Sequence, residues 1–157
     1  MKYARLTKEQ LDELHQEFIT FLATQSITAS EWSTIKEQKP EVAEEEIDVF
    51  SDLVWEGVLT KARYLENISS QQLFLFKIEE EVMKLIMIKV TDLAKDINTA
   101  TGYRWLQENF AGDSVEFFTS EKKFSGDKNA DIFSLIQQGA NITKGELYDF
   151  FHKILNP

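Results

Sequence analysis

The feature that most constrains the fold of this sequence is a helix-start pattern that occurs three times. In each copy a Thr precedes a Glu or Gln by three positions, and apolar residues five positions apart flank the pair. The Thr oxygen can accept a hydrogen bond from an unpaired amide of the first helical turn, and the Glu or Gln can accept one from the Thr amide. We therefore expect helices to begin at three positions: Thr7 (with Gln10), Thr28 (with Glu31) and Thr143 (with Glu146).

The chain has the size and composition of one globular domain. It has 157 residues, of which 43% are hydrophobic and twelve are Phe, and it contains no Cys. A chain of this length can bury about 70% of its unfolded surface around one core. Without Cys, disulfides, thiolate metal sites and cysteine nucleophiles are excluded. We expect a single domain over residues 1–157.

The start of the sequence indicates a cytoplasmic protein. The residues MKYARLTKEQ are charged and lead directly into the first expected helix, without an apolar stretch of signal-peptide length. Apolar runs such as Leu85–Ile88 are far shorter than a membrane span. We expect a cytoplasmic location and no membrane contact.

The net charge of −10 is concentrated in the first part of the chain. Residues 1–60 carry thirteen acids and five bases, a net of −8, whereas residues 61–157 carry fourteen acids and twelve bases, a net of −2. An acidic surface repels the phosphates of nucleic acids, and no stripe of Lys or Arg offsets it. We therefore expect no nucleic-acid partner; the acidity serves solubility or forms a docking face.

Apolar periodicity predicts a helical N-terminal half. A first helix is expected over Thr7–Ala23, because the apolar residues between Leu11 and Leu22 fall in one stripe at about 100° per residue. A second begins at Thr28 and ends before Pro40, whose ring disfavours helical geometry in the preceding residue. Pro40 suits the first turn of a third helix, which we expect to extend to about Arg63.

The segment Leu73–Thr91 fits either a long helix or two strands. Its Glu, Met, Leu and Lys residues are good helix formers. A helix, however, would be apolar nearly all round at both ends, where apolar residues alternate with their neighbours. The alternation favours two strands joined near Glu79–Glu81, although that turn lacks the Gly or Asn that hairpins usually carry.

Shorter elements complete an α+β fold. We expect a helix near Thr101–Asn109, a strand at Val115–Thr119 and an exposed loop over Ser120–Asn129. Two final helices are expected over Ala130–Gln138, ended by Gly139, and over Thr143–Leu155. The protein would then have a helical N-terminal half, a small antiparallel sheet (a hairpin at about 73–91 plus a strand near 115–119) and C-terminal helices. The alternative, with a helical segment 73–91, is an all-α protein.

Three segments of the sequence carry a resemblance to a known family. They are KYARLTKEQLDELHQEF, PEVAEEEIDVFSDLVWEGVL and ITKGELYDFF. Together they resemble a family of small conserved proteins of Bacteroidetes that has no assigned activity, and the resemblance covers nearly the whole chain. It implies a single-domain cytoplasmic protein of unknown function, and it implies no catalytic residues.

Both His residues follow an acid by three positions, as Asp12–His15 and Asp149–His152. This spacing on facing helices presents ligands in carboxylate-bridged di-metal bundles. On a helical wheel, however, Asp12 lies on the flank of the apolar stripe, and the second pair points to solvent. We therefore expect no metal and no cofactor, and a partly buried structural His15.

Glu46 is the one acid of the run Glu41–Glu56 that falls among the apolar residues of the third helix. A carboxyl group in such a place can have the raised pKa that catalysis uses. The structural explanation is a Glu at the edge of the stripe or one paired with a Lys or Arg. If the protein is a small enzyme of unrecognised type, His15 and Glu46 are its expected polar residues.

The best-motivated binding surface lies on the third helix, opposite its apolar stripe. There Trp55 and Leu59 stand beside Asp48 and Asp52 on an otherwise acidic face. A Trp and a Leu one turn apart on such a face are either covered within the fold or bind a partner. The acids oppose a symmetric contact, so a protein partner that carries Lys or Arg fits this face better than a homodimer does.

The sequence contains no Gly-rich phosphate loop, serine nucleophile elbow or kinase motif. We therefore expect a non-catalytic protein-interaction module rather than an enzyme. An enzyme would enclose convergent polar groups in an apolar cleft, whereas a binding module would present an exposed apolar patch.

Overall fold

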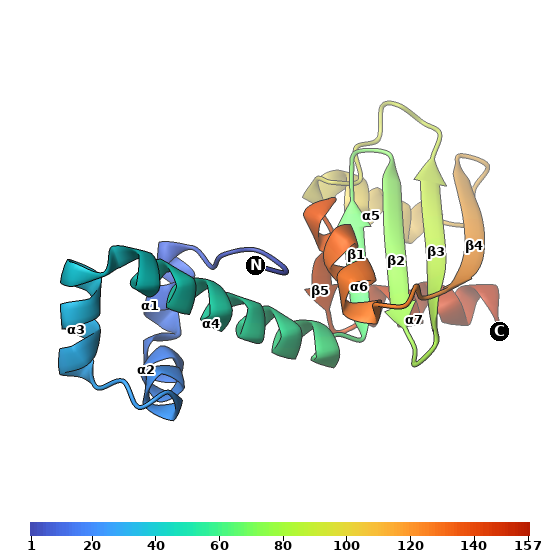
Figure 1. Ribbon diagram of the computed structural model, residues 1–157. Coiled ribbons are helices and arrows are strands. Elements are labelled where there is room, and N and C mark those ends of the chain that lie inside the picture. The colour runs from blue at the N-terminus through green and yellow to red at the C-terminus, as the bar shows by residue number, and fades with distance from the viewer. The chain divides into compact units, whose positions relative to one another are not determined.

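The computed structural model describes all 157 residues, and its internal contacts divide the chain into two compact units. Unit 1 is Met1–Thr60 and unit 2 is Lys61–Pro157. Unit 1 is helical, and unit 2 contains a five-stranded antiparallel sheet with three helices (Figure 1). The expected α+β class is confirmed, with helices at both ends of the chain. The expectation of a single domain stays a prediction.

Four helices form unit 1. They are α1 (Lys8–Glu13), α2 (His15–Thr24), α3 (Ala29–Gln38) and α4 (Pro40–Lys61). Two expected helix starts are confirmed: Thr7 and Thr28 each cap a helix, and Gln10 and Glu31 accept from the Thr amides in return. The expected single helix over Thr7–Ala23 is wrong, because α1 ends and α2 begins at Leu14. No Gly or Pro marks this break in the sequence.

An aromatic cluster joins three of these helices. The ring of Phe18 on α2 lies 5.2 Å from that of Trp32 on α3, edge to face, and 5.0 Å from that of Phe50 on α4. Phe21 also lies 5.4 Å from Phe50. Such aromatic pairs contribute about 0.5–1.5 kcal/mol beyond the area they bury. The apolar stripe expected on the first helix therefore supplies the core of unit 1.

Unit 2 is built on the sheet, whose strand order is β4-β3-β2-β1-β5. The strands are β1 (Tyr64–Ile68), β2 (Gln72–Ile78), β3 (Val82–Val90), β4 (Val115–Lys123) and β5 (Asn141–Thr143). The helices are α5 (Ala100–Asn109), α6 (Lys128–Gln137) and α7 (Glu146–Leu155).

The hairpin expected within Leu73–Thr91 is confirmed as β2 and β3. Its turn needs no Gly, because none of its residues has a positive φ. Lys128 of α6 also supports the turn: its Nζ donates to the carbonyl oxygens of Glu79 (2.7 Å) and Glu80 (3.2 Å). The turn is therefore supported by a contact from a distant part of the chain rather than by a Gly or Asn of its own.

Several expectations for unit 2 are wrong. β4 continues to Lys123, into the segment expected to be a loop, and β1 and β5 were not expected at all. Thr143 lies in β5 rather than at a helix start. The residue that precedes α7 is Gly145, which has a φ of +83°; a Cβ there would lie 2.5 Å from the ring of Tyr64. Both conditions require Gly at this position.

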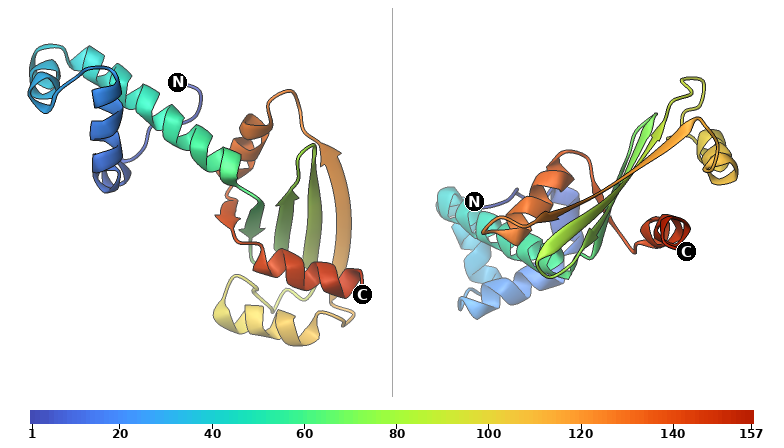
Figure 2. Two further views of the ribbon diagram at one scale, coloured as in Figure 1. Left: turned by 90° about the horizontal axis from the view of Figure 1, so that it is seen from below. Right: turned by 90° about the vertical axis from the view of Figure 1, so that its right-hand side faces the viewer.

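The two faces of the sheet are covered unequally (Figure 2). Helices α5 and α7 lie on one face, here called the core face, and α6 lies on the other, here called the second face. The core face holds the hydrophobic core of unit 2. Its fully or nearly fully buried members are Leu73, Leu75, Ile86, Ile88, Val90, Ile97, Leu106, Val115, Tyr148 and Phe151.

Candidate functional site

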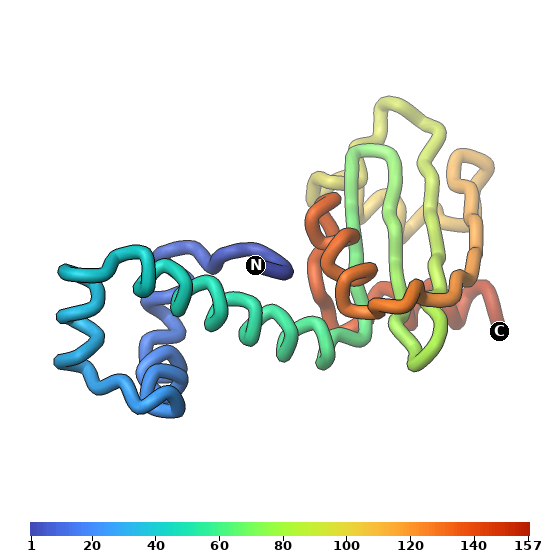
Figure 3. The backbone as a smooth tube through the Cα atoms, viewed as in Figure 1, coloured from blue at the N-terminus to red at the C-terminus, as the bar shows by residue number.

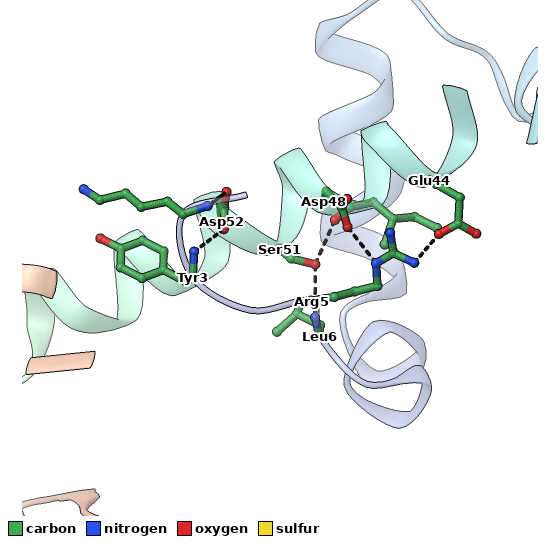
Figure 4. A network of polar contacts seen from close by, with 9 residues as sticks. Tyr3, Arg5, Leu6, Glu44, Asp48, Ser51 and Asp52 are labelled. Carbon is green, nitrogen blue, oxygen red and sulfur yellow. Dashed lines mark hydrogen bonds and ion pairs between the residues drawn. The ribbon is translucent and has the colours of Figure 1, made fainter. Parts of the chain in front are cut away.

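An acidic ladder on α4 binds the N-terminal segment of the chain, residues 1–6 (Figures 3 and 4). Residues four apart are neighbours on a helix surface, and four acids at this spacing line α4: Glu44, Asp48, Asp52 and Glu56. Arg5 pairs with Glu44 and with Asp48, the latter at 2.6 Å. Lys2 lies 3.9 Å from Glu56. The segment therefore runs antiparallel to α4, because its first residues contact the later acids.

Backbone hydrogen bonds hold the same segment. The amides of Lys2 and Tyr3 donate to the carboxylate of Asp52, at 2.7 and 2.9 Å. The amide of Leu6 donates to Ser51 Oγ at 3.1 Å, and that hydroxyl donates to the carbonyl of Ile47 at 2.8 Å. Both Ser51 and Leu6 are buried. The segment is thus anchored by a buried hydroxyl that both accepts and donates a hydrogen bond, as well as by surface charge.

The ladder changes the titration of the groups that meet on it. The hydrogen bond from the Arg5 guanidinium lowers the pKa of Asp48, and hydrogen bonds to Asp48 and then Glu44 raise the pKa of Arg5. Burial, followed by the hydrogen bond to Glu56, raises the pKa of the Tyr3 hydroxyl. These groups are largely exposed, and exposed ion pairs add little stability. The ion pairs of the ladder therefore add little to the stability of the fold.

The predicted interaction residues on α4 have different surroundings. Asp48 and Asp52 belong to the ladder and both contact the N-terminal segment. Trp55 is half-buried, and Leu59 is buried, with 1% of its surface exposed. For Leu59 the structure therefore matches the first of the two alternatives, a side chain covered within the fold. Whether Trp55 contacts a partner stays a prediction.

The polar residues named for an enzyme lie on two helices of unit 1. His15 is exposed at the start of α2, so the expectation of a partly buried side chain is wrong. Glu46 is half-buried on α4, and its Oε2 is enclosed without a hydrogen-bond partner. His152 and Asp149 are exposed on α7, as the wheel indicated. No group of three or more His, Asp or Glu side chains is placed to hold a metal ion.

The second face of the sheet is apolar where α6 leaves it uncovered. By the strand register, Phe74 lies opposite Met87, Phe76 opposite Leu85, and Met87 opposite Phe118. None of these side chains is buried, and Phe118 is 50% exposed. We call this surface the open half. Its members are Phe74, Phe76, Met83, Leu85, Met87 and Phe118.

A groove of about 350 Å³ separates the open half from α6. Phe76, Met83 and Leu85 line its sheet side, and Leu135 lines its helix side. Polar atoms come from Ser134 on α6, from Gln138 directly after α6, and from β4. Binding sites of this kind are mostly apolar with a few polar groups at the edge.

A separate set of polar groups lies on the core face of unit 2. Burial raises the pKa of Glu66 on β1, and burial together with the charge of Glu66 raises the pKa of Tyr103 on α5. A groove of about 290 Å³ next to Glu66 is lined by residues of β5 and the start of α7. A further groove of about 540 Å³ lies between α7 and strands β3 and β4, and Lys84 and His152 line it. Lys84 forms an ion pair there with Glu79 at 3.1 Å, and His152 Nδ1 lies 3.3 Å from the side-chain nitrogen Nδ2 of Asn156.

Sequence reasoning missed the open half, although a signal for it was present. On β2, both alternating sets are apolar: Leu73 and Leu75 on the core face, Phe74 and Phe76 on the second face. A strand that is apolar on both sides is expected to be covered on both. The partner of the acidic ladder was also missed, because Arg5 lies more than forty positions from Asp48 and nothing local links the two segments.

No helix of the structure combines the length and the apolar character that crossing a membrane requires. Residues 1–156 match the family of unknown function DUF6495, and the chain belongs to this family. The expected resemblance to an uncharacterised conserved family is thereby confirmed. No curated protein and no solved structure gives a significant match to the chain.

Proposed function

Since its family carries no assigned function, we propose that the protein is a non-catalytic interaction module that binds a helix of a protein partner on the open half. The observation that carries this proposal is the apolar surface itself, which includes Phe118 at 50% exposure. Large contiguous apolar patches are uncommon on monomeric proteins and mark contact sites. Such a patch is what a binding module, rather than an enzyme, was expected to show.

The dimensions of the sheet indicate a helix as the partner element. Five strands spaced by about 4.8 Å form a sheet about 20 Å wide, and a helix with its side chains is about 10 Å across. Two helices therefore cover one face, and α5 and α7 do so on the core face. Of the helices of unit 2, only α6 lies on the second face, which leaves room for one more helix beside it.

The charges that β3 and β4 place on the second face favour an acidic partner helix. The exposed charged side chains on the same side of β3 and β4 are Lys89, Glu116 and Lys122, two bases against one acid. Complementary charge guides association and helps to select the partner. The apolar side of the helix would fill the groove, as in other helix-in-groove contacts.

A photocrosslinking phenylalanine analogue tests the proposal in the host cytoplasm. Placed at Phe118, it should crosslink to one segment of a partner protein, with helical periodicity and acidic flanks. Phe150 on α7 is the matched control, because it is 42% exposed but lies outside the second face. A synthetic peptide of the captured segment should bind the purified protein at least tenfold more weakly after Met87→Lys, and unchanged after Lys153→Glu.

Three results would count against the proposal. The first is the same crosslinked products from positions 118 and 150, and the second is a crosslink from position 118 to residues 1–60 of the same chain. The third is a peptide affinity that Met87→Lys leaves unchanged, in a variant whose circular dichroism spectrum is normal. The first means nonspecific capture. The second means that the chain covers its own apolar face.

The acidic ladder of α4 remains a second proposed surface for the same function. The contacts of Arg5 and Lys2 with the ladder support a partner that carries Lys or Arg, which would have to displace them. Trp55 and Leu59 would then take part only if α4 exposes them on binding. We also propose the cytoplasm as the location and Bacteroidetes as the source. A small enzyme that uses His15 and Glu46 is the alternative function.

A further inference from the structure

The outer edge of β4 is a row of backbone groups that no strand pairs. β4 ends the sheet, and eight of its nine residues are at least partly exposed. The even-numbered residues of β4 direct their backbone hydrogen bonds toward β3. The bonds at the two ends of the strand pair show this: Thr91 N donates to Ser114 O, and Phe124 N donates to Glu81 O. Along an antiparallel strand, the amide and carbonyl groups of successive residues point alternately toward one neighbouring strand and away from it. Therefore the odd positions, from Phe117 to Lys123, direct their amides outward; the amide of Val115 already bonds Gly112.

We propose that a second copy of this chain pairs with this edge, β4 against β4, antiparallel and centred on Thr119. This register is the one that places all nine residues of the strand opposite a residue of the other copy, Val115 opposite Lys123, while the amide of Val115 keeps its bond to Gly112. It matches odd positions with odd positions, as the outward hydrogen bonds require. The inference rests on the edge of β4 and not on the open half, so it is independent of the proposed function.

Charge complementarity selects this arrangement. In the full-length register, Glu116 lies opposite Lys122 of the other copy, and the two-fold axis creates this pair twice. Opposite charges on facing positions of a strand pair stabilise it, and like charges destabilise it. A register that is offset by two positions places neither Glu116 nor Lys122 opposite the other. In-register parallel pairing would place Glu116 opposite Glu116.

The apolar residues of β4 also fit the pairing. Phe118 lies opposite Ser120 of the other copy and diagonal to the second Phe118, within reach of an aromatic side chain. The two open halves would then join across the dimer into one continuous apolar surface. A strand pair of nine residues is a small contact, so we expect a dimer that dissociates on dilution. The competing explanation is that the charges of β4 keep its edge monomeric, as charges on edge strands often do.

A charge exchange tests the register. In sedimentation velocity over a range of concentrations, the wild type should show a monomer–dimer equilibrium. Glu116→Lys and Lys122→Glu should each weaken the dimer at least tenfold, because each places like charges opposite each other twice. The double variant Glu116→Lys with Lys122→Glu should restore it. Glu108→Lys on α5 serves as the control and should change nothing.

A designed disulfide gives a second readout that does not depend on affinity. The chain has no Cys, so Thr119→Cys introduces a single thiol on the proposed two-fold axis. Directly facing residues of a hydrogen-bonded pair have Cα atoms about 5.5 Å apart, a distance that a disulfide spans. Mild oxidation should therefore link two copies through residue 119. Glu121→Cys is the matched control: the two copies of residue 121 would lie about 13 Å apart along the strands, so no bridge should form.

A wild type that is monomeric at all concentrations up to about 1 mM would overturn the proposal. So would a dimer that both charge reversals leave intact, since its interface would lie elsewhere. Equal disulfide formation at positions 119 and 121, or a double charge variant that stays monomeric with a native circular dichroism spectrum, would overturn the register.

Discussion

Single hydrogen bonds decide how the N-terminal segment is held. The hydroxyl of Ser51 is fully buried; it accepts a hydrogen bond from the amide of Leu6 and donates one to the carbonyl of Ile47. Losing one partner of a buried bond costs about 1–3 kcal/mol, whereas exposed ion pairs add about 0–1 kcal/mol. Ser51 therefore contributes more to this contact than the ladder charges do. The sequence identified Asp48 and Asp52 as unusual, but it gave no sign that residues 1–6 bind them.

Glu66 links the stability of unit 2 to the pH. Burial raises its pKa, so between its unfolded and folded pKa values the folded state binds more protons than the unfolded state. Stability therefore falls as the pH rises through this window. Glu66→Gln should raise the stability of the protein at pH 7. The gain should disappear below the unfolded pKa, about 4.3, where both states are protonated.

Urea unfolding at a series of pH values measures this effect. Glu108→Gln, at an exposed position on α5, should leave the curve unchanged. If Glu66→Gln lowers stability at pH 7 instead, the carboxylate makes a favourable contact and burial is not what governs it.

At the scale of elements, local signals predicted helix starts well and strand pairing poorly. The capping boxes at Thr7 and Thr28 act within three residues, so the local sequence determines them. Thr143 carries the same signal but lies in β5, because pairing with Tyr64 of β1 overrides it. β1 has a charged residue, Glu66, on the core face, so its sequence does not show the alternation of apolar and polar residues that would predict a strand. Strand contacts are long-range, and the local sequence cannot specify them.

The cap of α3 is the element-scale test. Thr28→Ala removes the hydrogen bond between Thr28 Oγ1 and the amide of Glu31 and should cost about 1 kcal/mol of unfolding free energy. Thr34→Ala on the same helix is the control, since its hydroxyl bonds only the carbonyl of Ser30. It should change stability by less than about 0.5 kcal/mol. Equal effects in chemical denaturation would mean that the cap is not what stabilises the start of α3.

At the scale of the whole molecule, the two units present different surfaces. The acidic ladder of unit 1 is already occupied by the N-terminal segment, whereas in unit 2 no helix of that unit covers the open half and no strand pairs the outer edge of β4. The sequence predicted the α+β class and the hairpin because apolar alternation reports strands. It could not show which face α6 would cover, because that depends on how the chain returns from β4. The candidate surface therefore emerged only from the fold.

The methionine methyl groups offer the most direct test of the open half. The chain has three Met residues; Met83 and Met87 lie on the open half, and Met1 lies outside it. Protein labelled with ¹³C only at these methyl groups gives three signals, of which two report on the proposed surface. In a lysate of the organism that encodes the protein, partner binding there should shift or broaden the signals of Met83 and Met87 and leave Met1 sharp. The same helical peptide captured at Phe118 should reproduce the shifts. Three signals that stay unchanged in the lysate and with the peptide would contradict the account.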